Sequence, residues 1–201
     1  MNKCYALLTL AHGIPDTEFD LIGVDRGALT AAEAGRRMKL AIGDFDSVEA
    51  SGAELIREMS DEVISLNRIK DDSDSEAAVR ELIRRGYEKI ILTGGTGGRL
   101  DHEIVNLRLV SLFPGIVMLE DPQNLVQAFG EGIHRIPAAG KKYISFFAAE
   151  PSVISLSGMK YTLSRRTFMP RDLYGLSNEV TGDEGVLTVH SGIILCVQSE
   201  D

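Results

Sequence analysis

The chain has 201 residues and a formal net charge of -9, a length that allows one large or two small domains. This acidity, together with the lack of a run rich in Lys and Arg, argues against a nucleic acid or an anionic membrane as partner, because either would need a basic surface. Apolar runs are far shorter than the roughly 20 residues that span a bilayer, and the brief apolar run at the start has no cleavage site of a signal peptide. Cys4 and Cys196 lie in apolar runs and are expected as buried free thiols. We therefore expect a soluble, cytoplasmic protein.

Strand and helix patterns alternate in the first part of the chain. Apolar strands are expected at 4–10, 21–24, 39–42, 63–66, 89–92 and 116–120, and helices at 48–59, 73–86 and 100–113. Such alternation is typical of a mainly parallel sheet with helices on both faces. We therefore predict an α/β domain over residues 1–122.

The periodicity changes after residue 122. Short apolar runs broken by Gly, Pro, Asn and Ser follow at 126–129, 134–136, 143–147, 153–156, 161–163, 186–189 and 193–197. A series of strands after a region of alternating strands and helices indicates a separate domain. We predict an all-β sandwich over residues 123–201.

Acidic residues follow the strands of the first domain. Asp25 lies in the segment GVDRGA, where Arg26 and Gly27 could help to form a pocket lined by backbone; the structural alternative is that Asp25 caps the next helix. Ligands of open α/β sheets bind outside the carboxyl ends of the strands. For Asp25, a functional role is therefore slightly favoured over a helix-capping role.

A pair of carboxylates, Asp44 and Asp46, follows the third strand in GDFDS. Alternate side chains of an extended segment share a face, and a hard divalent cation such as Mg²⁺ relieves the repulsion between such a pair. The alternative is a solvated turn in which Asp46 or Ser47 caps the helix at 48–59.

A second acidic turn, KDDSDSE at 70–76, follows the fourth strand. Ser73 and Glu76 have the spacing of a capping box, which gives Glu76 a structural role. Asp71, Asp72 and Asp74 exceed what one helix cap requires, and Lys70 beside them can neutralise a phosphate or a carboxylate.

The segment TGGTGGRLDHEIVN at 93–106 joins the fifth strand to a helix. Its glycines, among them Gly97 and Gly98, allow the backbone to approach a phosphate at a helix N-terminus. Arg99 can bind phosphate oxygens, and Asp101 can bind a metal or accept a proton. His102 and Asn106, one turn apart, share a helix face. The alternative is a structural turn with Asp101 placed favourably in the helix dipole; on these residues alone the two interpretations are evenly matched.

The acidic turns together predict one site, because the carboxyl ends of parallel strands meet at one edge. Five carboxylates from four turns, Asp25, Asp44, Asp46, Asp74 and Asp101, would repel one another there. A polyphosphate bound through metal ions is their natural complement.

Read in order, GVDRGA, GDFDS, KDDSDSE and GGTGGRLDHEIVN resemble the motifs of the bacterial thiamine pyrophosphokinase family, and GLSNEV with VLTVHSGIILCVQSED resembles the end of its β domain. The resemblance implies transfer of pyrophosphate from ATP to the hydroxyl of thiamine, giving thiamine diphosphate and AMP. It also implies a homodimer, with the β domain binding thiamine.

The same resemblance implies roles for individual residues. Asp44, Asp46 and Asp74 would hold Mg²⁺, and Asp46, Asp74, Asp101 and Arg99 would take part in catalysis. Groups that contact the nucleotide would be Asp25, Arg26, Gly27, Lys70, Ser73, Gly97, Gly98, His102 and Asn106. Ser177 and Asn178, in GLSNEV, would contact thiamine. Positioning and charge neutralisation of this kind are what phosphoryl transfer requires of a protein.

Two alternatives remain at the level of sequence. A pyrophosphokinase that acts on a hydroxymethyl pterin would carry similar metal and ATP motifs, but the C-terminal β domain with its GLSNEV loop favours thiamine. A module that binds nucleotide without catalysis would have little reason to keep five carboxylates together.

Overall fold

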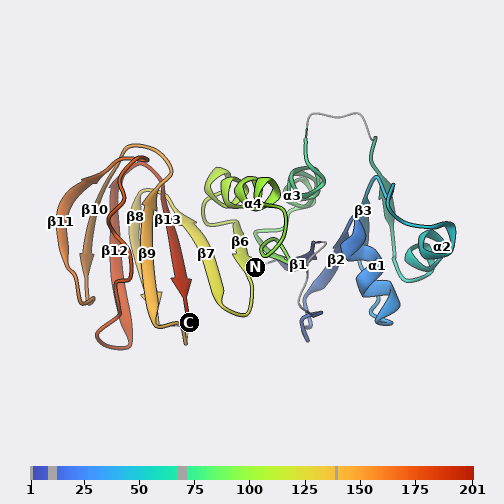
Figure 1. The fold of residues 1–201 in the computed structure, drawn as a ribbon, viewed down its shortest axis with the longest axis horizontal. Coiled ribbons are helices and arrows are strands. Elements are labelled where there is room, and N and C mark those ends of the chain that lie inside the picture. Colours follow the sequence, from blue (N-terminus) through green and yellow to red (C-terminus); the bar gives the residue numbers. More distant parts are fainter. Residues whose placement is uncertain (1, 9–12, 68–71, 139) are drawn as a thin grey trace. The chain divides into compact units, whose positions relative to one another are not determined.

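The computed structural model describes residues 2–8, 13–67, 72–138 and 140–201, and it divides into two compact units (Figure 1). The first unit is Met1–Asn106 and the second is Leu107–Asp201. The division falls within helix α4 (Leu100–Leu112). It precedes the change of composition near residue 122 because β6 (Val117–Glu120) pairs with β7 (Asn124–Phe129) and so belongs to the second unit. The functional division at 122 remains a prediction.

Five parallel strands form the sheet of the first unit, in the order β4-β3-β2-β1-β5. They are β1 (Lys3–Leu7), β2 (Asp20–Val24), β3 (Leu40–Gly43), β4 (Val63–Ser65) and β5 (Lys89–Thr93). The strands predicted here are confirmed, with ends that differ by a few residues; positions 9 and 10 of the strand predicted at 4–10 lie outside the described residues. In β2, β3 and β5 at least three consecutive residues are buried, so both faces of this sheet are covered. Because all five strands run the same way, their carboxyl ends meet at one edge.

Helices α1 (Arg26–Glu33), α2 (Ala50–Glu58) and α3 (Asp74–Arg84) cover the sheet. Figure 1 shows α1 and α2 beside β2 and β3, and their buried residues share one cluster with Leu21 and Ala41 of those strands. Helix α3 contacts β2 and β3 as well. The chain moves outward through β2, β3 and β4 and returns through α3 to β5, so right-handed crossovers place α3 on the opposite face from α1 and α2.

The start of α2 differs from the sequence expectation. The helix begins at Ala50 with Glu49 at its N-cap, whereas the sequence indicated a start at Val48 with Asp46 or Ser47 as the cap. Neither of those two side chains is therefore used to cap a helix. The capping part of the structural alternative for Asp46 is therefore wrong, whereas its exposed position in a turn agrees with that alternative.

Helix α4 is present where predicted, but Leu100 and Ile104, two apolar residues spaced as in a helical period, do not form its buried face. Leu100 and Ile104 are 69% and 43% exposed, whereas Leu109 and Val110 are buried. The apolar period therefore located the helix correctly while its first two members face solvent.

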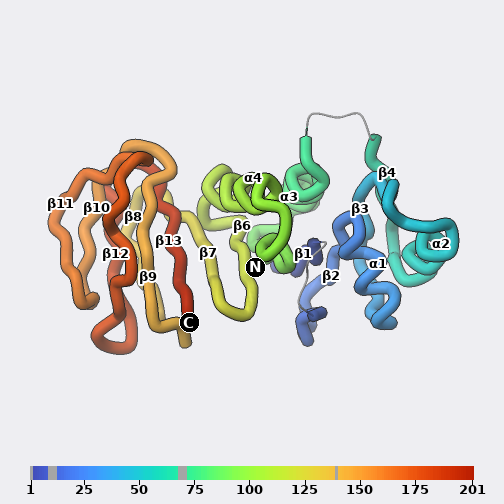
Figure 2. Tube along the Cα trace, in the orientation of Figure 1, coloured from blue at the N-terminus to red at the C-terminus, as the bar shows by residue number. Residues whose placement is uncertain are grey.

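The second unit contains two sheets around one core. The first combines β6, β7, β13 (Ile194–Ser199) and β9 (Tyr143–Ala148), and the second has the order β11-β10-β12-β8, with β8 (Gly132–Pro137), β10 (Ser152–Ser157), β11 (Leu163–Phe168) and β12 (Glu184–Ser191). In β10, β12 and β13 buried and partly exposed residues alternate, as expected of strands with one face in a core. Phe146, Ile154 and Leu187 contribute to one buried cluster from both sheets. Figure 2 traces the chain as it passes back and forth between them.

One predicted strand of the second unit was misplaced. The sequence indicated a strand at 161–163, whereas β11 occupies Leu163–Phe168. This strand lies at the edge of its sheet, and four of its six residues are exposed. Apolar periodicity does not reveal an edge strand of this kind because its polar residues remain in water.

Two further expectations concern helices and thiols. None of the helices in the described ranges is long and apolar enough to cross a membrane. Cys4 and Cys196 are both buried and unpaired, as predicted. Burial raises the pKa of each thiol to about 12, so both act as small apolar side chains.

Substitution of Gly27 measures how closely α1 packs against the end of β1. A Cβ at this position would lie 2.0 Å from the carbonyl oxygen of Leu7. Gly to Ala in a helix ordinarily stabilises by about 1 kcal/mol, but here overpacking should reverse the sign. We expect Gly27→Ala to lower the free energy of unfolding by about 1–3 kcal/mol in urea denaturation. Gly130→Ala is the control, because a Cβ there meets nothing within 4 Å; equal stability of the two variants would contradict the described packing.

Candidate active site

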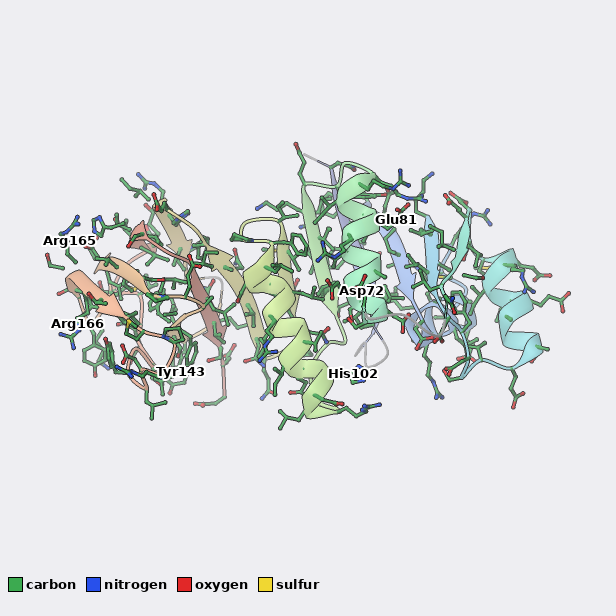
Figure 3. The ribbon with its side chains drawn as sticks, turned by 90° about the horizontal axis from the view of Figure 1, so that it is seen from above. Asp72, Glu81, His102, Tyr143, Arg165 and Arg166 are labelled. Carbon is green, nitrogen blue, oxygen red and sulfur yellow. The ribbon has the colours of Figure 1, made fainter. Side chains whose placement is uncertain are left out.

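A pocket of the first unit lies at the carboxyl edge of its sheet. Its volume is about 630 Å³, and it is bordered by the ends of β1, β2 and β5 and the N-terminal ends of α3 and α4. The lining residues are Leu8, Val24, Asp25, Ser73, Asp74, Ser75, Gly94, Gly95, Gly98, Arg99, His102, Glu103 and Asn106. Figure 3 labels Asp72, which shortly precedes α3, and His102 in the first turn of α4. The size suits a small-molecule ligand.

Sequence reasoning found about half of this lining. The predicted residues that line the pocket are Asp25, Ser73, Asp74, Gly98, Arg99, His102 and Asn106. Other described candidates, Arg26, Gly27, Asp44, Asp46, Gly97 and Asp101, are outside the lining set, and Lys70 falls outside the described residues. Leu8, Val24, Ser75 and Glu103 were missed. Leu8 was expected inside the strand predicted at 4–10, whereas β1 ends at Leu7. Nothing in the local sequence distinguished Glu103 from an ordinary residue of a first helical turn.

Asp25 occupies a sharp turn between β2 and α1. It has the N-cap position of α1 but makes no hydrogen bond to cap it, and its backbone angles are φ 49° and ψ -124°. Few residues other than glycine adopt positive φ. Gly43 allows this turn, because a Cβ there would lie 2.8 Å from the Cα of Asp25. The structural interpretation of Asp25 as a capping side chain is therefore wrong, and Asp25 lines the pocket instead.

The electrostatics of Asp25 link it to three other predicted carboxylates. Burial raises the pKa of the Asp25 carboxyl above its usual range, a hydrogen bond from the backbone of Arg26 opposes this, and the charges of Asp74, Asp44 and Asp46 raise it further. Its Oδ1 is buried and has no hydrogen-bond partner. Three of the other four predicted carboxylates thus lie close enough to act on Asp25 at this edge of the sheet.

The charges of these acids affect Asp25, but the side chains are not arranged as a metal site. Asp44 Oδ1 accepts a hydrogen bond from the backbone N–H of Asp46 at 3.0 Å, and Asp46 itself is exposed. Within the described residues, no three His, Cys, Asp or Glu side chains are already arranged to hold a metal ion. A cation would have to draw the carboxylates together.

The N-terminal end of α3 supplies one side of the pocket. Ser73 Oγ accepts a hydrogen bond from the backbone N–H of Glu76 at 3.2 Å, which confirms Ser73 as the N-cap. The Glu76 carboxylate instead binds Arg80, at 2.8 Å, so no reciprocal half of a capping box is formed. Asp74 is the first residue of the helix, where its negative charge also favours the helix dipole.

The glycine turn supplies the opposite side, and its donors are already engaged. The backbone N–H groups of Gly97 and Gly98 both donate to Glu103 Oε1, at 2.9 and 2.8 Å. These N–H groups were predicted to face a phosphate. In this structure they face a carboxylate of the same chain.

Arg99 and Asp101 pair with each other beside that turn. Arg99 Nε and Nη2 donate to the two carboxylate oxygens of Asp101 at 3.2 and 2.7 Å, and this hydrogen bonding holds the pKa of the Asp101 carboxyl below its usual range. The two side chains are 74% and 65% exposed. Asp101 therefore stands apart from the group around Asp25, against the expectation that all five carboxylates converge.

His102 and Asn106 share a helix face as predicted, and both line the pocket. Asn106 is only 4% exposed, and its Nδ2 donates to the carbonyl oxygen of Gly95 at 2.9 Å. Its Oδ1 is buried with no hydrogen-bond partner. A buried acceptor without a partner is costly, and this one borders a cavity large enough for a ligand to supply the donor.

In the second unit, the residues predicted to contact thiamine have different surroundings. Asn178 is buried, accepts from the backbone N–H of Tyr161 at 2.9 Å and donates to the Tyr161 carbonyl at 2.8 Å. Ser177 is exposed and has a positive φ of 53°. Asn178 and the aromatic side chains of Phe146, Phe168, Tyr161 and Tyr174 border a small pocket of about 140 Å³. Sequence reasoning missed these aromatic residues.

A pocket lined by acidic and glycine-rich turns at the carboxyl edge of a parallel sheet is the arrangement of nucleotide-binding α/β proteins. Comparisons with known proteins define the family. Residues 17–116 match the model of the thiamin pyrophosphokinase catalytic domain, and residues 133–194 match that of the thiamin pyrophosphokinase vitamin B1 binding domain. The chain therefore belongs to the thiamin pyrophosphokinase family.

Individual relatives agree with this assignment. The chain is 30% identical over 197 residues to the thiamine pyrophosphokinase of Bacillus subtilis (strain 168), covering 94% of this chain and 91% of that protein. A solved structure of a thiamin pyrophosphokinase family protein from Enterococcus faecalis has a TM-score of 0.86 and 28% identity, with 100% of both chains covered. That of the Bacillus subtilis enzyme has a TM-score of 0.84 and 27% identity, with 99% of each chain covered.

The family and the activity predicted from the motifs, ATP-dependent transfer of pyrophosphate to thiamine, are thereby confirmed. A hydroxymethyl pterin as the acceptor is not favoured.

The raised pKa of Asp25 gives a prediction for stability. A carboxyl whose pKa is raised by folding stabilises the folded state below its unfolded pKa, near 4, and this contribution is lost as the pH rises through the folded-state pKa. At pH 7 the Asp25 carboxyl therefore lowers the stability of the folded state. We expect Asp25→Asn to raise the melting temperature of the ligand-free protein by about 2–4 °C at pH 7, with the gain shrinking towards pH 4.

Thermal unfolding at several pH values measures this gain. Asp16→Asn, at an exposed position of the same unit, is the matched control and should show no such trend. A melting temperature of Asp25→Asn that is lower than that of the unchanged protein at pH 7 would show that the carboxylate is stabilised where it lies.

Proposed function

We propose that pyrophosphate transfer takes place in the pocket of the first unit. ATP binds with its phosphates between the N-terminal end of α3 and the glycine turn, and the hydroxyl oxygen of thiamine attacks the β-phosphorus. A new O–P bond forms, the bond from the β-phosphorus to the oxygen bridging the α- and β-phosphates breaks, and AMP leaves with that oxygen. The observation that carries this proposal is the pocket itself, which brings Asp25, Asp74 and Arg99 together in a member of this family.

Asp44, Asp46 and Asp74 are proposed to hold Mg²⁺, with Asp25 beside them. The donor set fits, because carboxylate oxygens are the ligands that Mg²⁺ prefers, and Asp25 Oδ1 is a buried oxygen in need of a partner. The ion would neutralise charge on the transferring phosphates. It would also relieve the repulsion from Asp74, Asp44 and Asp46, which adds to the effect of burial in raising the pKa of Asp25.

The remaining residues of the site are assigned to positioning. The phosphates would be bound by Arg99, Lys70, Gly97 and Gly98, with nucleotide contacts from Arg26, Gly27, Ser73, His102 and Asn106. Arg99 is held by Asp101 in the ligand-free chain, so binding of a phosphate exchanges one anion for another at its guanidinium. Asp101, once released from Arg99, would be placed in the first turn of α4 as one of the catalytic acids with Asp46 and Asp74.

The β domain, residues 123–201, is proposed as a sandwich that binds thiamine and forms a homodimer of a cytoplasmic enzyme. Support comes from the match to a vitamin B1 binding domain and from exposed apolar side chains near the proposed thiamine contacts. Leu173 and Leu176 are 89% and 54% exposed, and Tyr161 is 58% exposed. Ser177 would contact the aminopyrimidine directly. Asn178 would act with it, by fixing the segment that carries Tyr161.

A product assay tests the proposed site. The purified protein with ATP, Mg²⁺ and thiamine should release AMP and not ADP. Asp46→Asn and Asp74→Asn should each lower the rate by a factor of about 100 or more, since each removes a charge that positions the transferring group. Asp183→Asn, at an exposed residue of the second unit, should retain the activity. Release of ADP, or unaltered turnover in both site variants, would refute the proposal.

Ser177 and Asn178 should respond differently to substitution. Ser177→Ala should raise the KM for thiamine severalfold and leave the KM for ATP and the melting temperature nearly unchanged, because its side chain is exposed. Asn178→Ala should lower the free energy of unfolding by about 1–3 kcal/mol, because it removes a buried side chain that forms three partly buried hydrogen bonds with backbone groups of Tyr161 and Glu179. Steady-state kinetics with each substrate varied, together with urea denaturation, separate the two effects. An unchanged KM for thiamine in Ser177→Ala would exclude that contact.

A further inference from the structure

The glycine turn of the first unit already binds an anionic group, which is a side chain of its own helix. The N–H groups of Gly97 and Gly98 converge on a single oxygen, Glu103 Oε1, at 2.9 and 2.8 Å. Successive backbone N–H groups aimed at one oxygen are the arrangement with which such turns bind phosphate and other anions. Gly97 has a φ of 86°, a conformation that glycine adopts without strain.

The neighbouring guanidinium group, that of Arg99, is also paired with a carboxylate. Arg99 forms two hydrogen bonds with the Asp101 carboxylate. Each group that this turn offers to a phosphate, two N–H groups and one guanidinium, is therefore paired with a carboxylate from the first turn of α4. Glu103 and Arg99 both line the pocket that also contains Asp25 and Asp74, so a ligand entering the pocket meets these pairs directly.

On the basis of the proposed function, we propose that Glu103 occupies the position of an ATP phosphate in the ligand-free chain and has to leave the N–H groups of Gly97 and Gly98 when ATP binds. Glu103 thereby sets the affinity for the nucleotide. The apparent affinity is lower than the intrinsic one because the binding-competent turn, free of Glu103, is only a fraction of the population. A glutamate side chain can swing away by rotation about its own bonds, without movement of the helix.

Two substitutions separate competition from simple charge repulsion. Glu103→Gln keeps the length and an acceptor oxygen, but a neutral acceptor binds the N–H groups more weakly than a carboxylate does. Glu103→Asp keeps the charge, but it is one methylene shorter and loses the reach to the turn. If Glu103 competes with phosphate, both variants should bind ATP more tightly. If it only repels phosphate, only the neutral variant should do so.

Calorimetric titration with Mg²⁺-ATP in the absence of thiamine measures the affinity without turnover. We expect Glu103→Gln to bind about fivefold more tightly than the unchanged chain, the difference between a charged and a neutral hydrogen bond, and Glu103→Asp to bind more tightly as well. Glu54→Gln, at an exposed position of α2, removes one charge outside the pocket and should remain within about twofold of the unchanged chain. Thermal unfolding verifies that each variant is folded.

An affinity that is unchanged or lower in Glu103→Gln, or a gain that is absent from Glu103→Asp, would overturn the proposal. Amide resonances of Gly97 and Gly98 in the unsubstituted protein give a second measurement that does not depend on folding of a variant. Both should shift when Mg²⁺-ATP is added, and resonances that stay in place would also overturn it. Failure of the proposed function is distinguishable, because the unsubstituted chain would then bind no ATP at all.

Discussion

The parallel pairing of β1 with β2 and β5 is the constraint on which the site depends. It brings the ends of these strands to one edge, so Asp25 and the glycine turn, which are far apart in the sequence, border the same pocket. The sheet is buried on both faces, which leaves its edge as the place where polar turns can gather without disturbing the core. The fold thus separates stability, in the strands, from chemistry, in the turns that follow them.

Those turns are not optimised for the ligand-free state. Asp25 combines a positive φ, a raised pKa and a buried oxygen without a partner, and Asn106 adds a second buried acceptor. Each feature costs stability. These unfavourable features all lie around one pocket. A bound nucleotide and cation would supply the missing partners, so that binding restores the stability that the ligand-free protein lacks.

The glycine turn shows how an empty phosphate site can be kept folded. The N–H groups of Gly97 and Gly98 and the guanidinium of Arg99 are each paired with a carboxylate, from Glu103 and Asp101 of the same helical turn. A phosphate that binds to this turn has to replace the same carboxylates. Stability of the ligand-free turn and affinity for the nucleotide are therefore opposed through one pair of side chains.

Much of this was determined by the sequence alone. Apolar periodicity located the strands of the parallel sheet and helices α3 and α4, and the order of four motifs identified the family, because glycine, aspartate and arginine at fixed spacing reflect what phosphate and metal ions require. Tertiary structure decided the pairing of side chains, which periodicity does not encode: Asp101 binds Arg99 rather than joining Asp25, Glu103 fills the glycine turn, and Asn178 is bonded to Tyr161. It also decided which faces are buried, since Leu100 and Ile104 follow a helical period and yet are exposed. A local pattern records what each segment prefers, whereas the partner of a charged or polar group depends on which segments the completed fold brings within hydrogen-bonding distance.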